Sequence, residues 1–131
     1  MKYPDYVKKL ITMGANLDPS ETSVTKKILT ETKRDINKLK NKNDPANLTT
    51  LRLMEMLLTE PHIVASDLQK ITAKTLVLAG EKDIILDGHT RLIAKSIPKA
   101  EVLIFKGQTH FVPEENPALF NKAVLDFLAK P

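Results

Sequence analysis

Two short apolar runs in the second half of the chain predict buried β-strands. Residues 75–79 read Thr-Leu-Val-Leu-Ala and are closed by Gly80, and residues 101–105 read Glu-Val-Leu-Ile-Phe and end at Gly107. A continuous apolar run of this length is typical of a strand that is covered on both faces of a parallel sheet. We therefore expect two neighbouring strands with both faces buried.

Helical spacing between and after these runs predicts two helices. Residues 90–96 have a helical pattern with Leu92 and Ile93 expected to be buried, and Asn116-Pro117 opens a terminal helix whose apolar residues are Leu119, Phe120, Val124, Phe127 and Leu128. The order strand, helix, strand, helix with short connections is that of a βαβ unit, in which the strands are parallel. The fold class is therefore α/β.

The first part of the chain predicts a third strand and a helical segment. Residues 9–13 form a short apolar stretch that leads into a loop at Gly14. A helix capped by Ser20 or Thr22 follows, with an apolar stripe at Val24, Ile28, Ile36 and Leu39, and a second helix spans about residues 46–59 and ends before Pro61. We expect about three parallel strands with flanking helices.

Length and composition limit the classes of protein to which the chain can belong. The 131 residues suffice for one domain, there is no cysteine for a disulfide or a thiol nucleophile, and no apolar run reaches the roughly 18 residues of a membrane helix. The amino terminus lacks the apolar region of a secretion signal, so we expect a cytoplasmic protein. The net charge of +4 is spread thinly and only 5% of the residues are aromatic, which excludes the basic and aromatic patches of nucleic-acid binding.

A carboxylate and an imidazole follow the two buried strands. Asp83 comes directly after the first run and His110 after the second. The carboxyl ends of parallel strands meet at one edge of a sheet, where ligands and catalytic groups lie. The pair is the acid and base half of a charge relay, in which the carboxylate orients the imidazole and the imidazole takes a proton from a nucleophile.

Other interpretations of these residues stay open at this point. Asp83 can merely cap a turn and His110 can be an ordinary loop histidine, while Asp18 and Asp87 are rival candidates for the relay acid. The remaining histidines, His62 and His89, are expected to be structural or solvated. The stretch from Asp87 to His89 has no third ligand at a usable spacing, so we expect no metal and no cofactor.

The ordered set of motifs resembles the C-terminal half of the α/β-hydrolase family. The similarity is carried by residues 76–83 (Leu-Val-Leu-Ala-Gly-Glu-Lys-Asp), residues 97–102, the His110-Phe pair and a terminal helix ending in Phe127-Leu128. The stretch from Val7 to Ala15 is similar to the sixth strand of that fold. The resemblance implies one partial domain, with a strand and loop at residues 1–19, a helical lid-like insertion at 20–72 and a βαβα segment at 73–131.

The nucleophile of that family is missing from the sequence. In the family it lies on a Gly-x-Ser-x-Gly turn. None of the serines here, Ser20, Ser23, Ser66 and Ser96, has glycine two residues away on both sides. The resemblance therefore implies a truncated ester-type hydrolase that retains a triad remnant and is inactive alone, with a small-molecule substrate only if the missing half is supplied. The alternatives are a non-catalytic fragment that associates with itself and a module that complements a separate N-terminal half.

The expected partner is a second copy of the chain. In the family pattern, the strand around residues 9–13 lies beside a strand that is missing here. An open strand edge exposes unpaired N–H and C=O groups, which a second chain can pair with. We expect a homodimer through this edge, and neither a nucleic acid nor a membrane as partner.

Overall fold

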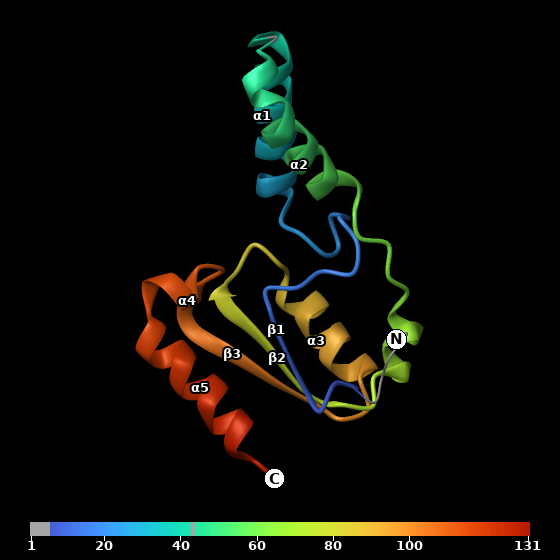
Figure 1. The fold of residues 1–131 in the computed structure, drawn as a ribbon, viewed down its shortest axis with the longest axis vertical. Helices are drawn as coiled ribbons and strands as arrows, with labels where there is room; N and C mark the ends of the chain where they lie inside the picture. Colours follow the sequence, from blue (N-terminus) through green and yellow to red (C-terminus); the bar gives the residue numbers. More distant parts are fainter. Residues whose placement is uncertain (1–5, 43) are drawn as a thin grey trace.

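A three-stranded parallel sheet forms the centre of the protein (Figure 1). The computed structural model describes residues 6–42 and 44–131. The strands are β1 (Lys9–Met13), β2 (Lys74–Lys82) and β3 (Ala100–Thr109), in the spatial order β1-β2-β3. All neighbouring strands are parallel, which confirms the predicted fold class and the three predicted strands.

Two helices cover the two faces of the sheet. Helix α3 (Asp87–Ser96) packs with Val77 in one hydrophobic cluster, and helix α5 (Pro117–Ala129) packs with Leu76 and Leu78 in another. Successive side chains of a strand point to opposite faces, so β2 contributes to both clusters. Val77 and Leu78 are 1% and 0% exposed. Burying each such side chain contributes roughly 1.5–3 kcal/mol, which makes β2 the centre of the core.

The prediction that the strand at residues 101–105, which is β3 in the structure, is covered on both faces was wrong. In β3, Val102 and Leu103 are each 38% exposed, and Phe105 is the apolar residue of the strand that is buried. The reason is position, because β3 lies at one side of the sheet and α3 and α5 cover it only in part. In α3, Ile93 is buried as expected but Leu92 is exposed, since consecutive residues point about 100° apart around a helix.

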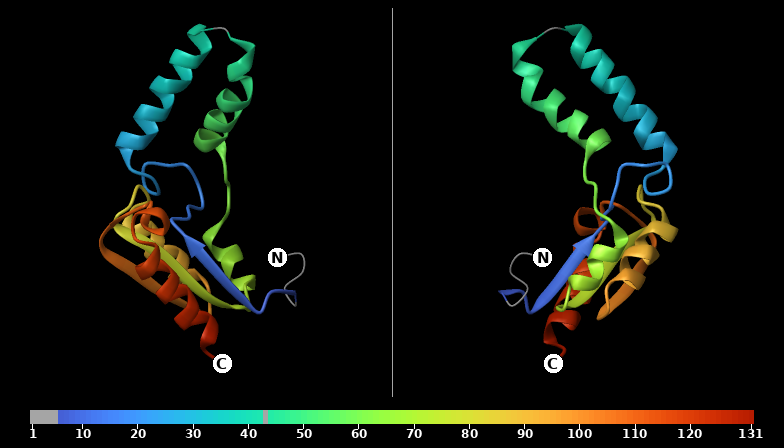
Figure 2. Two further views of the ribbon diagram at one scale, coloured as in Figure 1. Left: turned by 60° about the vertical axis from the view of Figure 1, so that its left-hand side comes forward. Right: turned by 90° about the vertical axis from the view of Figure 1, so that its right-hand side faces the viewer.

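A helical hairpin projects beyond the carboxyl edge of the sheet (Figure 2). It consists of α1 (Lys26–Lys42) and α2 (Leu48–Thr59), joined through a 3₁₀ turn at Pro45–Asn47. The expected first helix begins later than predicted. Val24 forms a β-bridge with Ile85, and the Thr25 N–H donates to the Ile84 carbonyl, so this stretch is extended rather than helical.

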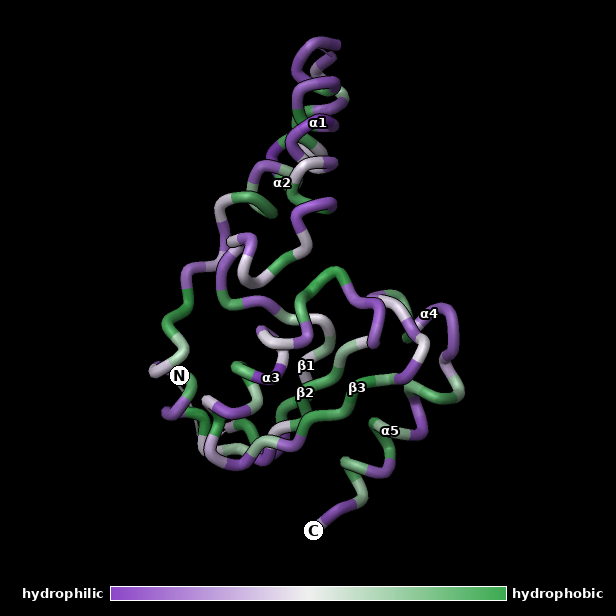
Figure 3. The backbone as a smooth tube through the Cα atoms, turned by 180° about the vertical axis from the view of Figure 1, so that it is seen from behind, coloured by the Kyte–Doolittle hydropathy of each residue, from purple (hydrophilic) through white to green (hydrophobic). Residues whose placement is uncertain are grey.

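Two short elements complete the fold. A 3₁₀ turn at Ala65–Lys70 leads back to β2, and helix α4 (Val112–Glu115), which the sequence did not predict, joins β3 to α5. Hydrophobic residues follow the strands, whereas α1 is largely hydrophilic (Figure 3). No helix in the described ranges is long and apolar enough to cross a membrane.

Candidate active site

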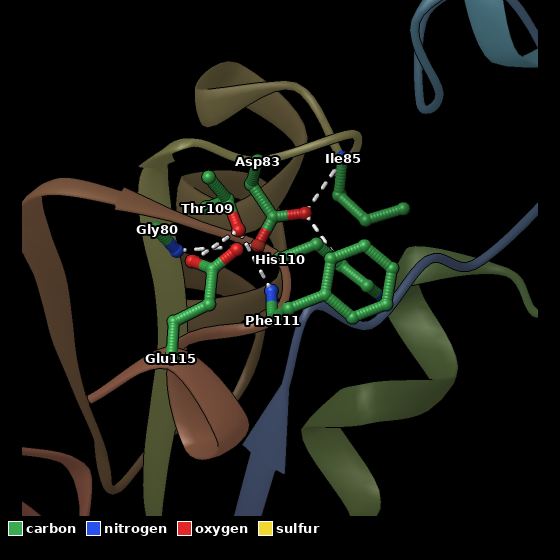
Figure 4. Close-up of polar contacts among 7 residues, drawn as sticks. All are labelled: Gly80, Asp83, Ile85, Thr109, His110, Phe111 and Glu115. Carbon is green, nitrogen blue, oxygen red and sulfur yellow. Dashed lines mark hydrogen bonds and ion pairs between the residues drawn. The ribbon is translucent and has the colours of Figure 1, made fainter. Parts of the chain in front are cut away.

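The loops that follow the three strands meet at the carboxyl edge of the sheet. They carry Gly14 after β1, Asp83 after β2 and His110 after β3. Asp83 Oδ1 and His110 Nδ1 are 2.7 Å apart (Figure 4). The sequence predicted that these two side chains lie within hydrogen-bonding reach, and they do. The distance is typical of a charge-assisted hydrogen bond.

Two backbone N–H groups hold the Asp83 carboxylate in place. The Ile85 N–H donates to Oδ1 at 2.9 Å and the Gly80 N–H donates to Oδ2 at 3.2 Å (Figure 4). The side chain is only 1% exposed. A buried carboxylate is stable only when its oxygens accept hydrogen bonds, and here both do.

These contacts set the charge of Asp83. Burial raises the pKa of its carboxyl group, but the hydrogen bonds from His110, Ile85 and Gly80 outweigh burial, so the pKa lies below its ordinary value. Asp83 is therefore ionised at neutral pH. A carboxylate can only accept a hydrogen bond, so the proton between the two residues is on Nδ1 of His110.

One ring nitrogen of His110 is hydrogen-bonded to Asp83, and the other can accept a proton. The hydrogen bond to Asp83 raises the pKa of His110 more than burial lowers it. The side chain is 27% exposed, and Nε2 has no hydrogen-bond partner within residues 6–42 and 44–131. The arrangement can chemically accept a proton at Nε2 while Asp83 stabilises the resulting cation.

Gly14 belongs to this site and was missed by the sequence analysis. A Cβ atom at this position would lie 2.4 Å from His110 Cε1 and 2.5 Å from Nδ1, and φ is +55°. Only glycine adopts this backbone conformation without strain and leaves room for the ring. The signal that could have indicated this role is the position of Gly14, directly after a predicted strand and therefore at the carboxyl edge of the sheet.

The loop that carries His110 is braced by its neighbours. The Thr109 hydroxyl donates to Glu115 at 2.8 Å and accepts from the Phe111 N–H at 3.1 Å (Figure 4). The Phe111 ring lies edge-on to the imidazole, with the ring centres 5.5 Å apart. These contacts help to orient His110, and Thr109 is a second residue that the sequence analysis did not identify.

The rival acids lie elsewhere. Asp18 accepts hydrogen bonds from the Ser20 N–H and the Ser23 hydroxyl, both at 2.9 Å. Asp87 forms an ion pair with Arg91 at 2.8 Å on the surface of α3. Of the three candidate carboxylates, only Asp83 is hydrogen-bonded to His110.

The other histidines have no place in this site. His89 is 5% exposed, and its Nε2 accepts the Leu17 N–H at 2.9 Å. Burial lowers the pKa of His89 more than nearby Asp18 raises it, so its ring is neutral at neutral pH. His62 is exposed. In the ranges that the structure describes, no three His, Asp or Glu side chains are grouped so that they could hold a metal ion.

Comparisons with curated proteins give two partial matches. The chain is 40% identical over 65 residues to the proline iminopeptidase PfmaB of Pestalotiopsis fici, a match that covers 49% of this chain and 23% of that protein. It is 43% identical over 65 residues to the 2-hydroxy-6-oxononadienedioate/2-hydroxy-6-oxononatrienedioate hydrolase of Cupriavidus pinatubonensis, covering 48% of this chain and 22% of that protein. The matched region is thus less than a quarter of either relative. No family model matches the chain.

Solved structures match nearly the whole chain. The α/β hydrolase MGS-M2 from a Medee basin deep-sea metagenome library superimposes with a TM-score of 0.74 at 20% identity, covering 99% of this chain and 59% of that one. The esterase RhEst1 from Rhodococcus sp. ECU1013 gives a TM-score of 0.69 at 17% identity, covering 97% of this chain and 57% of that one. The chain therefore has a partial α/β-hydrolase fold, with Asp83 and His110 paired at the carboxyl edge of its sheet.

Proposed function

We propose that this chain is part of an α/β-hydrolase in which Asp83 is the acid and His110 the base of a catalytic triad. The observation that carries the proposal is the 2.7 Å contact between a buried, ionised carboxylate and a partly exposed imidazole at the carboxyl ends of neighbouring strands. An aspartate that only caps a turn accepts hydrogen bonds from backbone N–H groups and does not require an imidazole partner. The names of the relatives, an iminopeptidase and a hydrolase, support hydrolysis as the reaction class.

The proposed chemistry uses each atom of the pair. Nε2 of His110 removes the proton of an attacking hydroxyl, and the imidazolium that forms is stabilised by the charge of Asp83. The same Nε2 then returns the proton to the leaving group. Gly14 and Thr109 keep the ring in the orientation that these transfers need.

The nucleophile of the proposed reaction is not one of the four serines. Ser20 and Ser23 are hydrogen-bonded to one another beside Asp18, and the Ser96 hydroxyl donates to the Leu92 carbonyl. Ser66 lies in the 3₁₀ turn before β2. None of the four is hydrogen-bonded to His110 in the part of the chain that the structure describes. We propose that another segment supplies the nucleophile, so the 131 residues alone hydrolyse esters poorly.

The test is the pH dependence of slow ester hydrolysis by the 131-residue chain. Neutral imidazole promotes the hydrolysis of 4-nitrophenyl acetate, so the contribution of His110 rises with pH through its raised pKa. We expect His110→Gln to remove this contribution. Asp83→Asn removes the carboxylate that raises the pKa, so the midpoint shifts to lower pH. The control variant His62→Gln changes an exposed histidine outside the site and should retain the full His110 profile.

Two results would contradict this proposal. An unchanged profile in His110→Gln would remove His110 from the role of base. Saturable turnover that a serine-directed phosphonate abolishes would identify a nucleophile within the chain.

We also propose that the chain associates with a second copy through the open edge of β1. The Gly14 N–H donates to the Leu78 carbonyl, and N–H groups alternate in direction along a strand, so the N–H groups of Ile11 and Met13 point away from β2. The charged residue of β1, Lys9, is bound to the Leu128 carbonyl at 2.6 Å. Charged side chains are a common protection of a strand edge, and the rest of β1 has none.

Proline at position 11 tests this mode of association. Ile11→Pro removes an N–H that points away from β2, so the β1–β2 ladder remains while a chain-to-chain ladder is broken. Ile11→Ala keeps the N–H and is the matched control. Light scattering should give a dimer for the original chain and for Ile11→Ala, and a monomer for Ile11→Pro. A monomeric original chain at micromolar concentration would contradict self-association, and dispersal by both variants would contradict the ladder.

A further inference from the structure

We propose that the cavity beside His110 binds an uncharged, apolar group about the size of a phenyl ring, and that the helical hairpin selects for it. This inference rests on the proposed function, because it concerns the ligand of the same site. The cavity has a volume of about 180 Å³ and is lined both by loops at the carboxyl edge of the sheet and by residues of α1 and α2.

The walls of the cavity are mostly aliphatic, with Asn16 and Thr32 as the uncharged polar side chains. The hairpin contributes Ile28 and Leu29 from α1 and Leu57 and Leu58 from α2. Such walls offer an ionised ligand little replacement for its lost hydration, and they favour an apolar one.

One lining residue of the cavity also contacts Asp83 directly. Ile85 lines the cavity and is 5% exposed, while its backbone N–H holds the Asp83 carboxylate. His110 also lines the cavity. A ligand in this cavity lies against the imidazole of His110. The apolar group of a substrate would therefore be held next to the bond that is hydrolysed.

The charges around the cavity exclude anions. Glu60 is the one ionisable residue among the lining residues besides His110, and no lysine or arginine lines the cavity. At a pH above the pKa of His110, where the ring is neutral, a carboxylate-bearing ligand would meet Glu60 without a cation to pair with. This composition differs from that of a cavity suited to a dicarboxylate, which cationic side chains bind most strongly.

The size of the cavity limits the ligand. An apolar protein cavity of about 150 Å³ is large enough for benzene. At about 180 Å³, the cavity beside His110 fits one such ring or an alkyl group of similar volume. A fragment this small binds with a dissociation constant on the order of millimolar, because few atoms are in contact.

Benzyl alcohol and benzoate test the proposal, since they share a ring and differ in charge. Neither contains a bond that the proposed hydrolase would cleave. In an NMR titration of the 131-residue chain, benzyl alcohol should shift the amide signals of Gly14, Asn16 and Ile85, all from lining residues. Benzoate should bind at least about tenfold more weakly.

Position 57 tests the role of the hairpin. Leu57 is 60% exposed, so Leu57→Lys should leave the fold intact while placing a cation at the cavity. We expect this variant to bind benzoate better and benzyl alcohol less well than the original chain. Leu53→Lys is the matched control, because Leu53 is 55% exposed on the same helix and does not line the cavity. It should change neither affinity.

The outcomes separate this inference from the proposed function. Benzoate binding as tightly as benzyl alcohol, or benzyl alcohol shifts that leave Gly14 and Ile85 unaffected, would overturn the inference while the pH profile of His110 still stands. Binding of benzyl alcohol at these amides, together with an ester-hydrolysis profile that Asp83→Asn leaves unchanged, would uphold the cavity and overturn the triad.

Discussion

Gly14 lies directly against the His110 ring, and alanine at this position perturbs the Asp83–His110 pair without replacing either residue. The added methyl group would lie 2.4 Å from Cε1 and 2.5 Å from Nδ1 of His110. Both distances are far inside van der Waals contact. The imidazole therefore has to move, and the hydrogen bond from Nδ1 to Asp83 is lost with it.

The expected loss of stability has two parts. An alanine in the left-handed conformation of Gly14 costs roughly 1–2 kcal/mol, and losing a hydrogen bond to a charged group costs about 1.5–3 kcal/mol. Gly14→Ala should therefore lower the free energy of unfolding by roughly 2.5–5 kcal/mol.

Two other glycines serve as controls. Gly107 has φ +73° and no atom within 4 Å of an added Cβ, so Gly107→Ala measures backbone strain alone. Gly88 has neither a positive φ nor a close neighbour, and it lies in α3. Gly88→Ala should raise stability by up to about 1 kcal/mol, because alanine is the better helix former.

Urea unfolding measures these differences, and NMR titration measures the pKa of His110. With the contact to Asp83 broken, the pKa of His110 should fall from its raised value. The interaction that raises the pKa of His110 stabilises the folded protein fully below the unfolded-state pKa of about 6.5. This stabilisation is lost as the pH rises through the folded-state pKa. The difference between Gly14→Ala and Gly107→Ala should therefore shrink as pH rises. Equal losses in the two variants, with the pKa of His110 still raised, would refute the reasoning.

Three further substitutions test contacts outside the Asp83–His110 pair, each by urea unfolding. His89→Leu leaves the Leu17 N–H without its acceptor and should cost about 1–3 kcal/mol. Because burial lowers the pKa of His89, this stabilisation is present above about pH 6.5 and is lost as pH falls, so equal losses at pH 5 and pH 8 would contradict it. Thr90→Val removes a buried hydroxyl that has no hydrogen-bond partner among the described residues and should raise stability by up to about 1 kcal/mol, whereas a loss would reveal a partner. Asn116→Ala removes the side chain that accepts the Leu119 N–H at the start of α5 and should cost roughly 0.5–2 kcal/mol, unless the adjacent proline alone sets the start of the helix.

The pairing of Asp83 with His110 was predictable because it depends on a local rule. The two residues end consecutive strands joined by one helix, and such strands are parallel neighbours. Their carboxyl ends therefore meet whatever the rest of the fold does. The role of Gly14 was not predictable in this way, since it requires β1 to pair with β2 across the whole helical hairpin.

Burial was the least predictable property. The runs at residues 75–79 and 101–105 have similar apolar content, yet Leu78 is fully buried and Leu103 is not. The difference comes from the position of each strand in the sheet, which sequence pattern alone does not contain. Likewise, Val24 fits a helical spacing, but its bridge to Ile85 keeps it extended.

The placement of the helical hairpin between β1 and β2 affects the order in which the chain folds. β2, α3 and β3 follow one another with short connections, so their contacts close small loops. β1 ends at Met13 and its partner strand begins only at Lys74, so this contact closes a long one. Closing a long loop loses more chain entropy, and contacts distant in sequence form more slowly. The segment that carries both Asp83 and His110 can thus assemble first, and β1, which brings Gly14 under the ring, docks last.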